Sequence, residues 1–520
     1  MKQHVLKCVT LLMALCMMVA FVAGCGGEQT TDPNDSTKKT TTTTTNAGGS
    51  KAEENESTTT TAESGKTQNN TKNNTQNKTT TTTKGGGESS TLPKNLGGAT
   101  IKVAGMENCY FALNASKNEW NRQIRNQLSA IAKSLNCKFS LNTYDSEGLT
   151  QQAITADRAG SKFADLMMTT LWQQSDLVVS KALQDLNSID GLDLTKSYWD
   201  QNSHKETQLY GKNFIAYTTL DGTAANANVI FFNKTLAKQV GTSDTALYKM
   251  VKDGTWTFSQ MQALSQKALK DLNGNGIDYE NGTDQYGFTG VDIRGGVSYS
   301  IFKAQGGYFT KTSSNGDITY ALGDAKNISA LRTMQTWLLK DKSVFNSDKG
   351  GNDHEIGYEI FQDGRVLFLG WSADSATNFI EMDDDWGILP YPKADKNSDY
   401  VSVISWNTQG FSIPRKVTGD SLQNAAAVMD AIAKQFDTIR ENKQAYMQSR
   451  VYRDTQTQEM LDIAAAGASI DFCQYGDLGS GGLSTIHFLF DNVSNDPATR
   501  VNSVKEEATS HLNTFLKAVK

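Results

Sequence analysis

A threonine-rich stretch near the start of the chain limits how much of it can fold. Residues 28–95 hold 22 threonines and no aromatic residue in 68 positions. Their only apolar side chains are Ala47, Ala52, Ala62 and Leu92. Such a sequence buries too little apolar surface to offset the entropy lost on ordering. We therefore expect a flexible tether with an r.m.s. span of roughly 45 Å. The remaining part, 96–520, is a body of about 425 residues, large enough for one two-lobed unit or two to three domains.

The first 25 residues resemble the signal peptide of a bacterial lipoprotein. Two lysines precede an apolar run, residues 8–22, that ends in Val22-Ala23-Gly24-Cys25, a sequence similar to a lipobox. The run is shorter than the ~20 residues that a transmembrane helix needs. The pattern predicts removal of residues 1–24 and attachment of palmitate or similar acyl chains to Cys25. The protein would then be held on the extracellular face of a Gram-positive type of cell membrane. An ordinary secretory signal with an incidental cysteine is the alternative.

The charge of the body excludes some partners. Removing residues 1–24 leaves 48 Lys and Arg against 56 Asp and Glu, a net charge of −8. The tether carries eight acids and eight lysines, so the whole net charge belongs to the body. A protein that neutralises phosphates would show a basic excess, and none is present. We expect no nucleic-acid partner and no membrane contact other than the lipid anchor.

The body opens with strand and helix patterns in alternation. Period-2 or apolar strands and amphipathic helices follow one another at Ala99–Gly105, Lys117–Leu135, Cys137–Tyr144, Leu149–Ala159 and Phe163–Met168. This β-α-β-α-β order predicts a parallel sheet with right-handed crossovers. Ligands of such sheets lie beyond the carboxyl ends of the strands. The segments 106–108 and 169–172 are therefore the first candidate ligand loops.

The rest of the body mixes both kinds of element. Further strands are predicted at Asn213–Leu220, Ala227–Phe232, Val366–Gly370, Trp386–Leu389 and Gly410–Ile413, and further helices at Asn327–Lys340, Ser421–Phe436 and Val501–Val519.

Six segments of the body form a set whose order is informative. In chain order they are LQDLNSIDGLDLTKSYWD (183–200), VIFFNKTLAKQVG (229–241), DGTWTFSQM (253–261), DLNGNGIDYENGTDQYGFTG (271–290), FQDGRVLFLGW (361–371) and DDWGILPYPKAD (384–395). Together they resemble one protein family, the family 1, sugar-type solute-binding lipoproteins of bacterial ABC importers. The resemblance runs from about residue 97 to about residue 519. No single segment is diagnostic, but their order behind a lipobox is typical of the family.

The resemblance implies a fold and a function. The fold is α/β, a two-lobed periplasmic-binding-protein-like (type II) fold with the ligand cleft between the lobes. Lobe 1 would comprise about 96–221 and 370–413, and lobe 2 about 222–369 with part of 414–520. The function is to capture a carbohydrate, in particular an oligosaccharide, and deliver it to the permease of an ABC importer, without catalysis and as a monomer. The alternatives are an anchored polysaccharide-degrading enzyme and a binding protein for another solute, such as a peptide.

Sugar recognition requires aromatic faces and a few polar groups that bind hydroxyls. Trp172, Trp371 and Trp406 follow or precede predicted strands in loops, so we expect them at the ligand. Their polar partners are expected among Glu107, Asn108, Gln173, Asp221, Ser372, Asp374 and Asn407. The other five tryptophans are expected in the core: Trp120, Trp199, Trp256, Trp337 and Trp386.

A second motif indicates a structural calcium ion. Oxygen-bearing side chains at Asp271, Asn273 and Asn275, the Gly276 turn and the Ile277 carbonyl match the first half of a calcium loop. The glutamate that ends an EF-hand loop is missing. Asp284 is the acid chosen to complete the site, with Asp278 and Glu280 as alternatives. A solvated Asn/Gly turn without metal is the competing interpretation.

Signatures of enzymes fail on inspection. His354-Glu355 lacks the second histidine of a zinc helix. Gly370–Asp374 lacks the last glycine of a nucleophile elbow. A glycosidase pair of carboxylates stays open. The body keeps three cysteines, Cys109, Cys137 and Cys473, which allow one disulfide at most. Free thiols are favoured, and no pairing is fixed.

Overall fold

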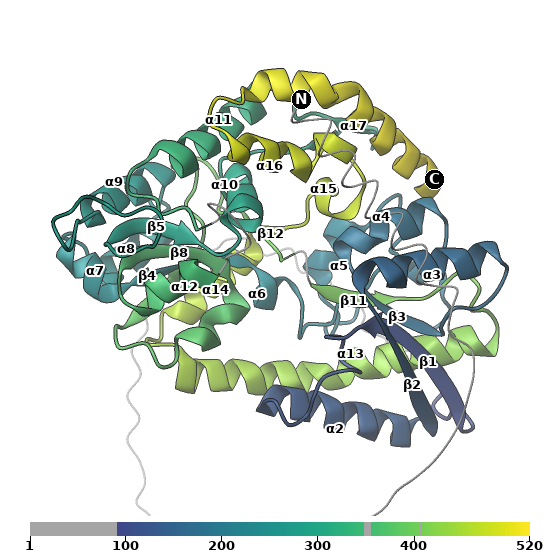
Figure 1. The fold of residues 1–520 in the computed structure, drawn as a ribbon. Helices are drawn as coiled ribbons and strands as arrows, with labels where there is room; N and C mark the ends of the chain where they lie inside the picture. The colour runs from purple at the N-terminus through teal and green to yellow at the C-terminus, as the bar shows by residue number, and fades with distance from the viewer. Residues whose placement is uncertain (1–90, 348–354, 406–407) are drawn as a thin grey trace, which may run out of the picture. The chain divides into compact units, whose positions relative to one another are not determined.

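The computed structural model describes residues 91–347, 355–405 and 408–520 (Figure 1). The described residues all belong to one compact unit, Gly86–Lys520. The signal peptide, Cys25, most of the tether, Trp406 and Asn407 lie outside the described residues. Within the described ranges, no helix has both the length and the apolar character needed to cross a membrane.

A four-stranded sheet, called here the first sheet, forms from the N-terminal part of the body. Its order is β11-β3-β1-β2, with β1 (Ala99–Met106), β2 (Cys137–Tyr144), β3 (Leu166–Thr170) and β11 (Gln409–Ser412). β1 is parallel to both β2 and β3, as the sequence predicts. β11 comes from far along the chain and is antiparallel to β3, with Gln409 opposite Thr170. The predicted parallel sheet is therefore confirmed for β1, β2 and β3, and the antiparallel β11 is a fourth strand that the sequence did not assign to this sheet.

Two helices cross between the strands of the first sheet, and each starts at a side chain that caps it. α2 (Glu119–Ser134) begins after Asn118, whose Oδ1 accepts a hydrogen bond from the Asn121 amide at 2.8 Å. α3 (Ser146–Arg158) begins after Asp145, whose Oδ1 accepts from the Gly148 amide at 2.6 Å. Such caps satisfy amides that have no partner inside the helix. They fix where the chain turns after β1 and β2.

A second four-stranded sheet has the order β5-β8-β4-β9. Its strands are β4 (Asn228–Asn233), β5 (Tyr286–Gly290), β8 (Val366–Ser372) and β9 (Trp386–Leu389). β5 and β8 are parallel, whereas β4 is antiparallel to both β8 and β9. Almost every residue of these strands is buried, which explains why their sequences are continuous apolar runs rather than alternating patterns.

Three segments connect the two sheets. Residues 216–227 lead into β4, and residues 404–411 lead back into the first sheet; the two are joined by bridges between Ala227 and Ile404 and between Ala216 and Phe411. The third connection is α13 (Asp420–Tyr446), which lies alongside α2 (Figure 1). Its buried apolar residues between Ala425 and Ile439 belong to the core around the first sheet, and Met447, just after its end, belongs to the core around the second.

The C-terminal helices contact elements of both sheets. α17 (Pro497–Val519) packs against α4 (Leu171–Val179), which follows β3, and against α11 (Ala325–Lys340). Two smaller helices, α15 (Phe472–Tyr475) and α16 (Leu483–Asp491), lie between α11 and α17 in sequence. α15 also contacts α4.

Several expectations about packing can be compared with the structure. Trp199, Trp256, Trp337 and Trp386 are buried, which confirms them as core residues. Trp120 is only half-buried, and its ring contacts that of Tyr446 edge-on at 5.3 Å. Residues 213–220 do not form a strand but make isolated bridges, because their backbone pairs with several short segments in turn. Leu92 and Leu96 are both buried, so the packed part of the chain starts before the predicted residue 96.

Candidate functional site

The carboxyl edge of the first sheet brings together polar side chains from distant parts of the sequence. Glu107 and Asn108 are exposed directly after β1. The Asn108 Oδ1 accepts a hydrogen bond from the Gln409 Nε2 at 2.8 Å. Gln409 in turn lies opposite Thr170, the last residue of β3. The loops after β1 and β3 and the start of β11 thus meet at one edge, as expected for a ligand site in such a sheet.

Trp172 is the exposed aromatic side chain of this edge. It lies in the first turn of α4, not in the loop that the sequence predicts, because the helix starts immediately after β3. The side chain is 42% exposed, which is unusual for a tryptophan in a folded domain. Its position agrees with an aromatic platform for a ligand.

Gln173, its neighbour, has a structural role. It is 1% exposed, and its Oε1 accepts from the Thr170 amide at 2.9 Å. Its Nε2 donates to the Ser146 carbonyl at 2.8 Å. Both ends of the amide therefore hold the start of α4 in place. These two hydrogen bonds and its burial make Gln173 the weakest of the predicted ligand residues on this edge.

The carboxyl edge of the second sheet carries Trp371 and Ser372. Both lie inside β8, one to two residues beyond the predicted strand end. The Trp371 ring stacks on Tyr358 of α12 (Glu355–Gln362), with centroids 5.5 Å apart and planes 14° from parallel. It also meets the Phe379 ring edge-on at 6.3 Å. One side of this indole is thus covered by protein, in contrast to Trp172.

Three buried polar atoms at these edges have no hydrogen-bond partner among the described residues. They are the Ser372 Oγ, the Thr408 Oγ1 and the Gln409 Oε1. A buried polar group without a partner costs about 1–3 kcal/mol, so it normally indicates a water or a ligand. All three are oxygens of short or flexible side chains, which can form hydrogen bonds with water or with a ligand hydroxyl.

Asp221 lies in the connection between the sheets and contacts the loop after β1. The Tyr110 hydroxyl donates a short hydrogen bond to its Oδ2. Burial raises the pKa of the Asp221 carboxyl; the Tyr110 hydrogen bond and the Lys443 ammonium oppose this, and the nearby charge of Asp374 adds to it. Burial also raises the pKa of Tyr110. Asp221 and Asp374 are therefore close enough to interact, although they follow different elements.

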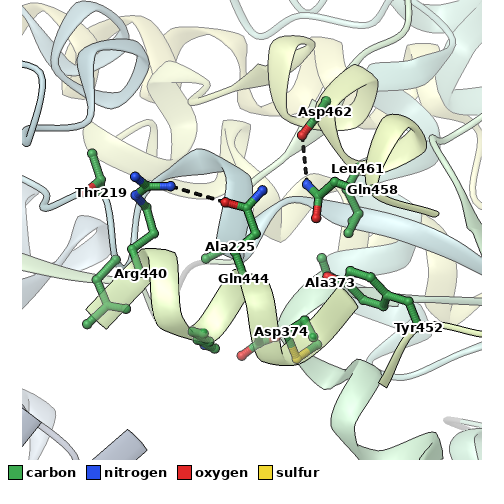
Figure 2. A pocket seen from close by; sticks show the side chains of 13 residues that line it. Thr219, Ala225, Ala373, Asp374, Arg440, Gln444, Tyr452, Gln458, Leu461 and Asp462 are labelled. Carbon is green, nitrogen blue, oxygen red and sulfur yellow. Dashed lines mark hydrogen bonds between the residues drawn. The ribbon is translucent and has the colours of Figure 1, made fainter. Parts of the chain in front are cut away.

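A cavity of about 230 Å³ lies next to the connection that carries Asp221 (Figure 2). Its wall comes from the connection at residues 216–227, the segment after β8, α13 and α14 (Thr457–Ala466). The lining residues are Thr219, Leu220, Ala225, Ala373, Asp374, Arg440, Lys443, Gln444, Met447, Tyr452, Gln458, Leu461 and Asp462. Figure 2 shows Arg440 donating to Gln444 and Gln458 donating to Asp462, at 3.3 and 2.9 Å. Among the predicted ligand residues that the structure describes, Asp374 alone lines this cavity.

The predicted calcium loop is held together by its own amides. Asp271 accepts hydrogen bonds from the amides of Gly274 and Gly276 at 2.6 and 2.8 Å. Asp284 is fully buried and accepts from the amides of Leu272 and Asp278 at 2.9 and 2.8 Å. These bonds lower the pKa of Asp271, with the Gly276 amide as the largest cause.

The donor set of this loop partly fits a cation. Asn273 and Asn275 are exposed and Asp271 is half-buried; all three offer oxygen ligands, and the Ile277 carbonyl follows them. Asp284 directs both carboxylate oxygens at backbone amides, so it is the weakest member of the predicted set. Among the described residues, no group of three or more His, Cys, Asp or Glu side chains could hold a metal. Calcium binding stays a prediction.

The three cysteines of the body are unpaired, in agreement with the favoured expectation. Cys109 and Cys137 are buried and Cys473 is half-buried. Burial raises the pKa of all three thiols, which makes them poor nucleophiles at neutral pH.

Four residues near the edges were not identified from the sequence: Tyr110, Tyr358, Gln409 and Lys443. Tyr110 follows the end of the predicted strand Ala99–Gly105 by five residues, so the rule that located Glu107 and Asn108 could also have found it. Gln409 precedes a strand whose antiparallel direction the sequence does not reveal. Lys443 lies on a long helix among other charged residues and carries no distinguishing signal.

Comparisons with known proteins agree with this architecture. The model of a family described as bacterial extracellular solute-binding protein matches residues 129–418, more than half of the chain. A search of curated protein sequences found no match.

Similar solved structures share the fold at low sequence identity. One is a maltose/maltodextrin-binding domain from Bdellovibrio bacteriovorus bound to maltotriose. It has 14% sequence identity and a TM-score of 0.53, and the match covers 80% of this chain and 100% of that chain. Another is an ABC substrate-binding protein from Listeria monocytogenes in complex with cycloalternan. It has 12% sequence identity and a TM-score of 0.54, and the match covers 80% of this chain and 99% of that chain. A third is the GacH receptor of Streptomyces glaucescens. It has 12% sequence identity and a TM-score of 0.52, and the match covers 81% of this chain and 99% of that chain. At these identities the likeness concerns the fold, which is the expected two-lobed type.

Proposed function

Because the chain belongs to the family of bacterial extracellular solute-binding proteins, we propose that it captures a carbohydrate, in particular an oligosaccharide, and delivers it to an ABC importer. The observation that carries the proposal is the family match over residues 129–418 together with the polar and aromatic edges of both sheets. Similar structures include proteins bound to maltotriose and to cycloalternan, which supports a saccharide as the class of ligand.

The ligand would lie between the two carboxyl edges. On the first sheet, Trp172 supplies an apolar face, and Glu107 and Asn108 supply polar groups. On the second sheet, Trp371 supplies the other aromatic ring and Ser372 a buried hydroxyl without a partner. Trp406 and Asn407, outside the described residues, remain candidates for the same site. Aromatic faces with a few convergent polar groups are the composition that saccharide sites require.

The mechanism needs no covalent step. A ligand that contacts both edges binds the closed arrangement of the lobes better than the open one, so it shifts the population toward closure. An importer that recognises the closed form would then receive loaded protein in preference to empty protein. The three connections between the sheets are the segments in which such a movement must be absorbed.

Attachment to the membrane would occur through acyl chains on Cys25, with the protein acting as a monomer. The lipobox-like Val22-Ala23-Gly24-Cys25 supports the anchor. A Cys25→Ala variant should lose metabolic labelling by palmitate and appear in the medium or remain unprocessed. Labelling of the variant equal to that of the parent would exclude lipidation at this residue.

A structural calcium ion in the loop from Asp271 to Asp284 is a separate proposal. An ion that binds only the folded state would add about 2.7 kcal/mol at 100-fold excess over its dissociation constant. Chelation should therefore lower the melting temperature of the parent but not of Asp271→Ala. Asp317→Ala, a change in another exposed turn, is the matched control and should stay sensitive to chelator. An unchanged parent melting curve would leave the loop as an amide-bonded turn without metal.

The experiment for the main proposal is a thermal-shift screen of an oligosaccharide panel, followed by product analysis of each hit. We expect at least one saccharide to raise the melting temperature and to be recovered unchanged. Cleavage of a hit would favour the polysaccharide-degrading alternative. Stabilisation by peptides and by no saccharide would favour a different solute.

A further inference from the structure

The cavity beside Asp221 is lined by two of the three connections between the sheets and by elements that pack on the second sheet. Thr219, Leu220 and Ala225 belong to the first connection between the sheets, and Ala373 follows β8 of the second sheet. Met447 follows α13, the third connection. Because connecting segments and one lobe share the wall, a change in the angle between the lobes must change the shape of the cavity.

The wall includes an irregular turn at the end of α13. The helix continues at Met447–Val451 as a π-helical turn, and the Tyr452 amide donates to the Met447 carbonyl at 2.8 Å. Such turns often mark functional sites in helices. This one lies where the chain passes from the core of the first sheet to that of the second, and both Met447 and Tyr452 line the cavity.

The lining favours an uncharged and mainly apolar occupant. The apolar wall is formed by Leu220, Ala225, Ala373, Met447 and Leu461. The charged lining residues balance, with two cations, Arg440 and Lys443, and two acids, Asp374 and Asp462. The volume of about 230 Å³ exceeds the ~150 Å³ of an apolar cavity that holds benzene. Gln444 and Gln458 can bind one hydroxyl of such a molecule.

We propose that this cavity is a second binding site, which takes a small uncharged molecule of single-ring size and thereby regulates closure of the lobes. Binding shifts an equilibrium only when the two states differ in affinity, and a cavity whose wall moves with the lobes meets that condition. The effect is reciprocal: occupation changes the affinity for the main ligand, and the main ligand changes the affinity of the cavity. This regulatory role rests on the proposed transport function, whereas binding in the cavity does not.

Two substitutions change the cavity in opposite directions. Ala225→Leu adds volume inside it, and Met447→Ala removes side-chain volume from its wall. Leu264→Ala is the matched control, because Leu264 has a burial close to that of Met447 but does not line the cavity. Melting curves of all variants are the check that each one remains folded.

The first readout is calorimetric titration with benzyl alcohol, a single ring with one hydroxyl. The parent and Leu264→Ala should bind it, and Ala225→Leu should bind at least tenfold more weakly. No binding to the parent, or equal binding to Ala225→Leu, would overturn the site.

The second readout is the distance between spin labels at Lys138→Cys and Lys249→Cys, exposed positions on β2 and on α8 (Asp244–Lys252), in a chain without other thiols. Ala225→Leu and Met447→Ala should shift the distance distribution between the labels in opposite directions. They should also change the affinity for the best saccharide by about fivefold each, again in opposite directions. Shifts of the same sign, or none, would overturn the coupling. If the parent binds no saccharide, the proposed transport function is wrong. The titration and the label distances still test whether the cavity binds a small molecule and whether its volume affects closure of the lobes.

Discussion

The carboxyl edges of the two sheets differ in how much of their aromatic surface is free. At the first sheet, Trp172 stands in the first turn of α4 and is 42% exposed. At the second sheet, Trp371 lies within β8 and stacks on Tyr358. A ligand platform can therefore be a side chain that the fold leaves bare or one that the fold also uses for packing. Substitution should separate binding from stability at the first edge and mix them at the second.

The largest expected effect is an acid sensitivity located on the first lobe. His204 lies in α5 (Gln201–Thr207), and burial lowers its pKa to about 4 from 6.5, with Asp200 opposing the shift. Between these values the unfolded chain takes up a proton that the folded chain does not. The stability is therefore intact above pH 6.5 and falls as the pH drops toward 4, by about 3 kcal/mol at 1.36 kcal/mol per unit.

Hydrogen exchange measured at pH 7 and pH 5 tests this acid effect. Amides of β1 and β2 should lose protection more than those of β4 and β8, and His204→Gln should flatten the dependence. Equal losses in both sheets would remove this difference between the regions.

Next in size is Trp371→Ala. Loss of the stacked ring should lower the free energy of unfolding by about 2 kcal/mol, since the side chain is half-buried against Tyr358 and Phe379. Saccharide binding should weaken as well. Trp337→Ala, a fully buried ring in α11, is the control: it should cost about 3–5 kcal/mol of stability and leave the intrinsic affinity of the folded protein unchanged. Denaturant curves and calorimetry measure both quantities, and a Trp371→Ala variant as stable as the parent would contradict the packing role.

The smallest change in stability is expected for Trp172→Ala. Its ring is exposed, so the melting curve should match that of the parent. Its saccharide affinity should fall by about 1–2 kcal/mol, or roughly 5- to 30-fold. Tyr210→Ala removes another exposed aromatic ring, away from the edges, and should leave binding unchanged. Weakened binding in both variants would mean that the effect is not specific to the first edge.

The first sheet was largely predictable, because its strands and helices carry clear periodicities. β2 has the predicted bounds, and β1 differs by one residue. The directions of β4 and β11 were not predictable, since the chain between distant strands does not reveal on which side the return strand pairs. α13 extends ten residues past its predicted end at Phe436, where polar residues hide a helix that continues across the connection.

Position after a strand could be predicted from the sequence, whereas tertiary contacts could not. Glu107, Asn108 and Trp172 lie at the carboxyl edge of the first sheet, as expected, because they follow predicted strands, and their contact with a ligand stays a prediction. Gln173 was assigned to the ligand because the sequence does not show that its amide would cap α4. Trp371 was expected in a loop because Gly370 resembled a strand end, but the ladder with β4 continues to Ser372.

A crystal structure of the protein with its best saccharide tests the central claim most directly. The claim predicts a saccharide between the two sheet edges, in contact with Trp172 and Trp371 and within hydrogen-bond distance of Asn108. The cavity beside Asp221 should hold no part of that saccharide. A saccharide bound in that cavity, or at a surface away from both edges, would contradict the claim.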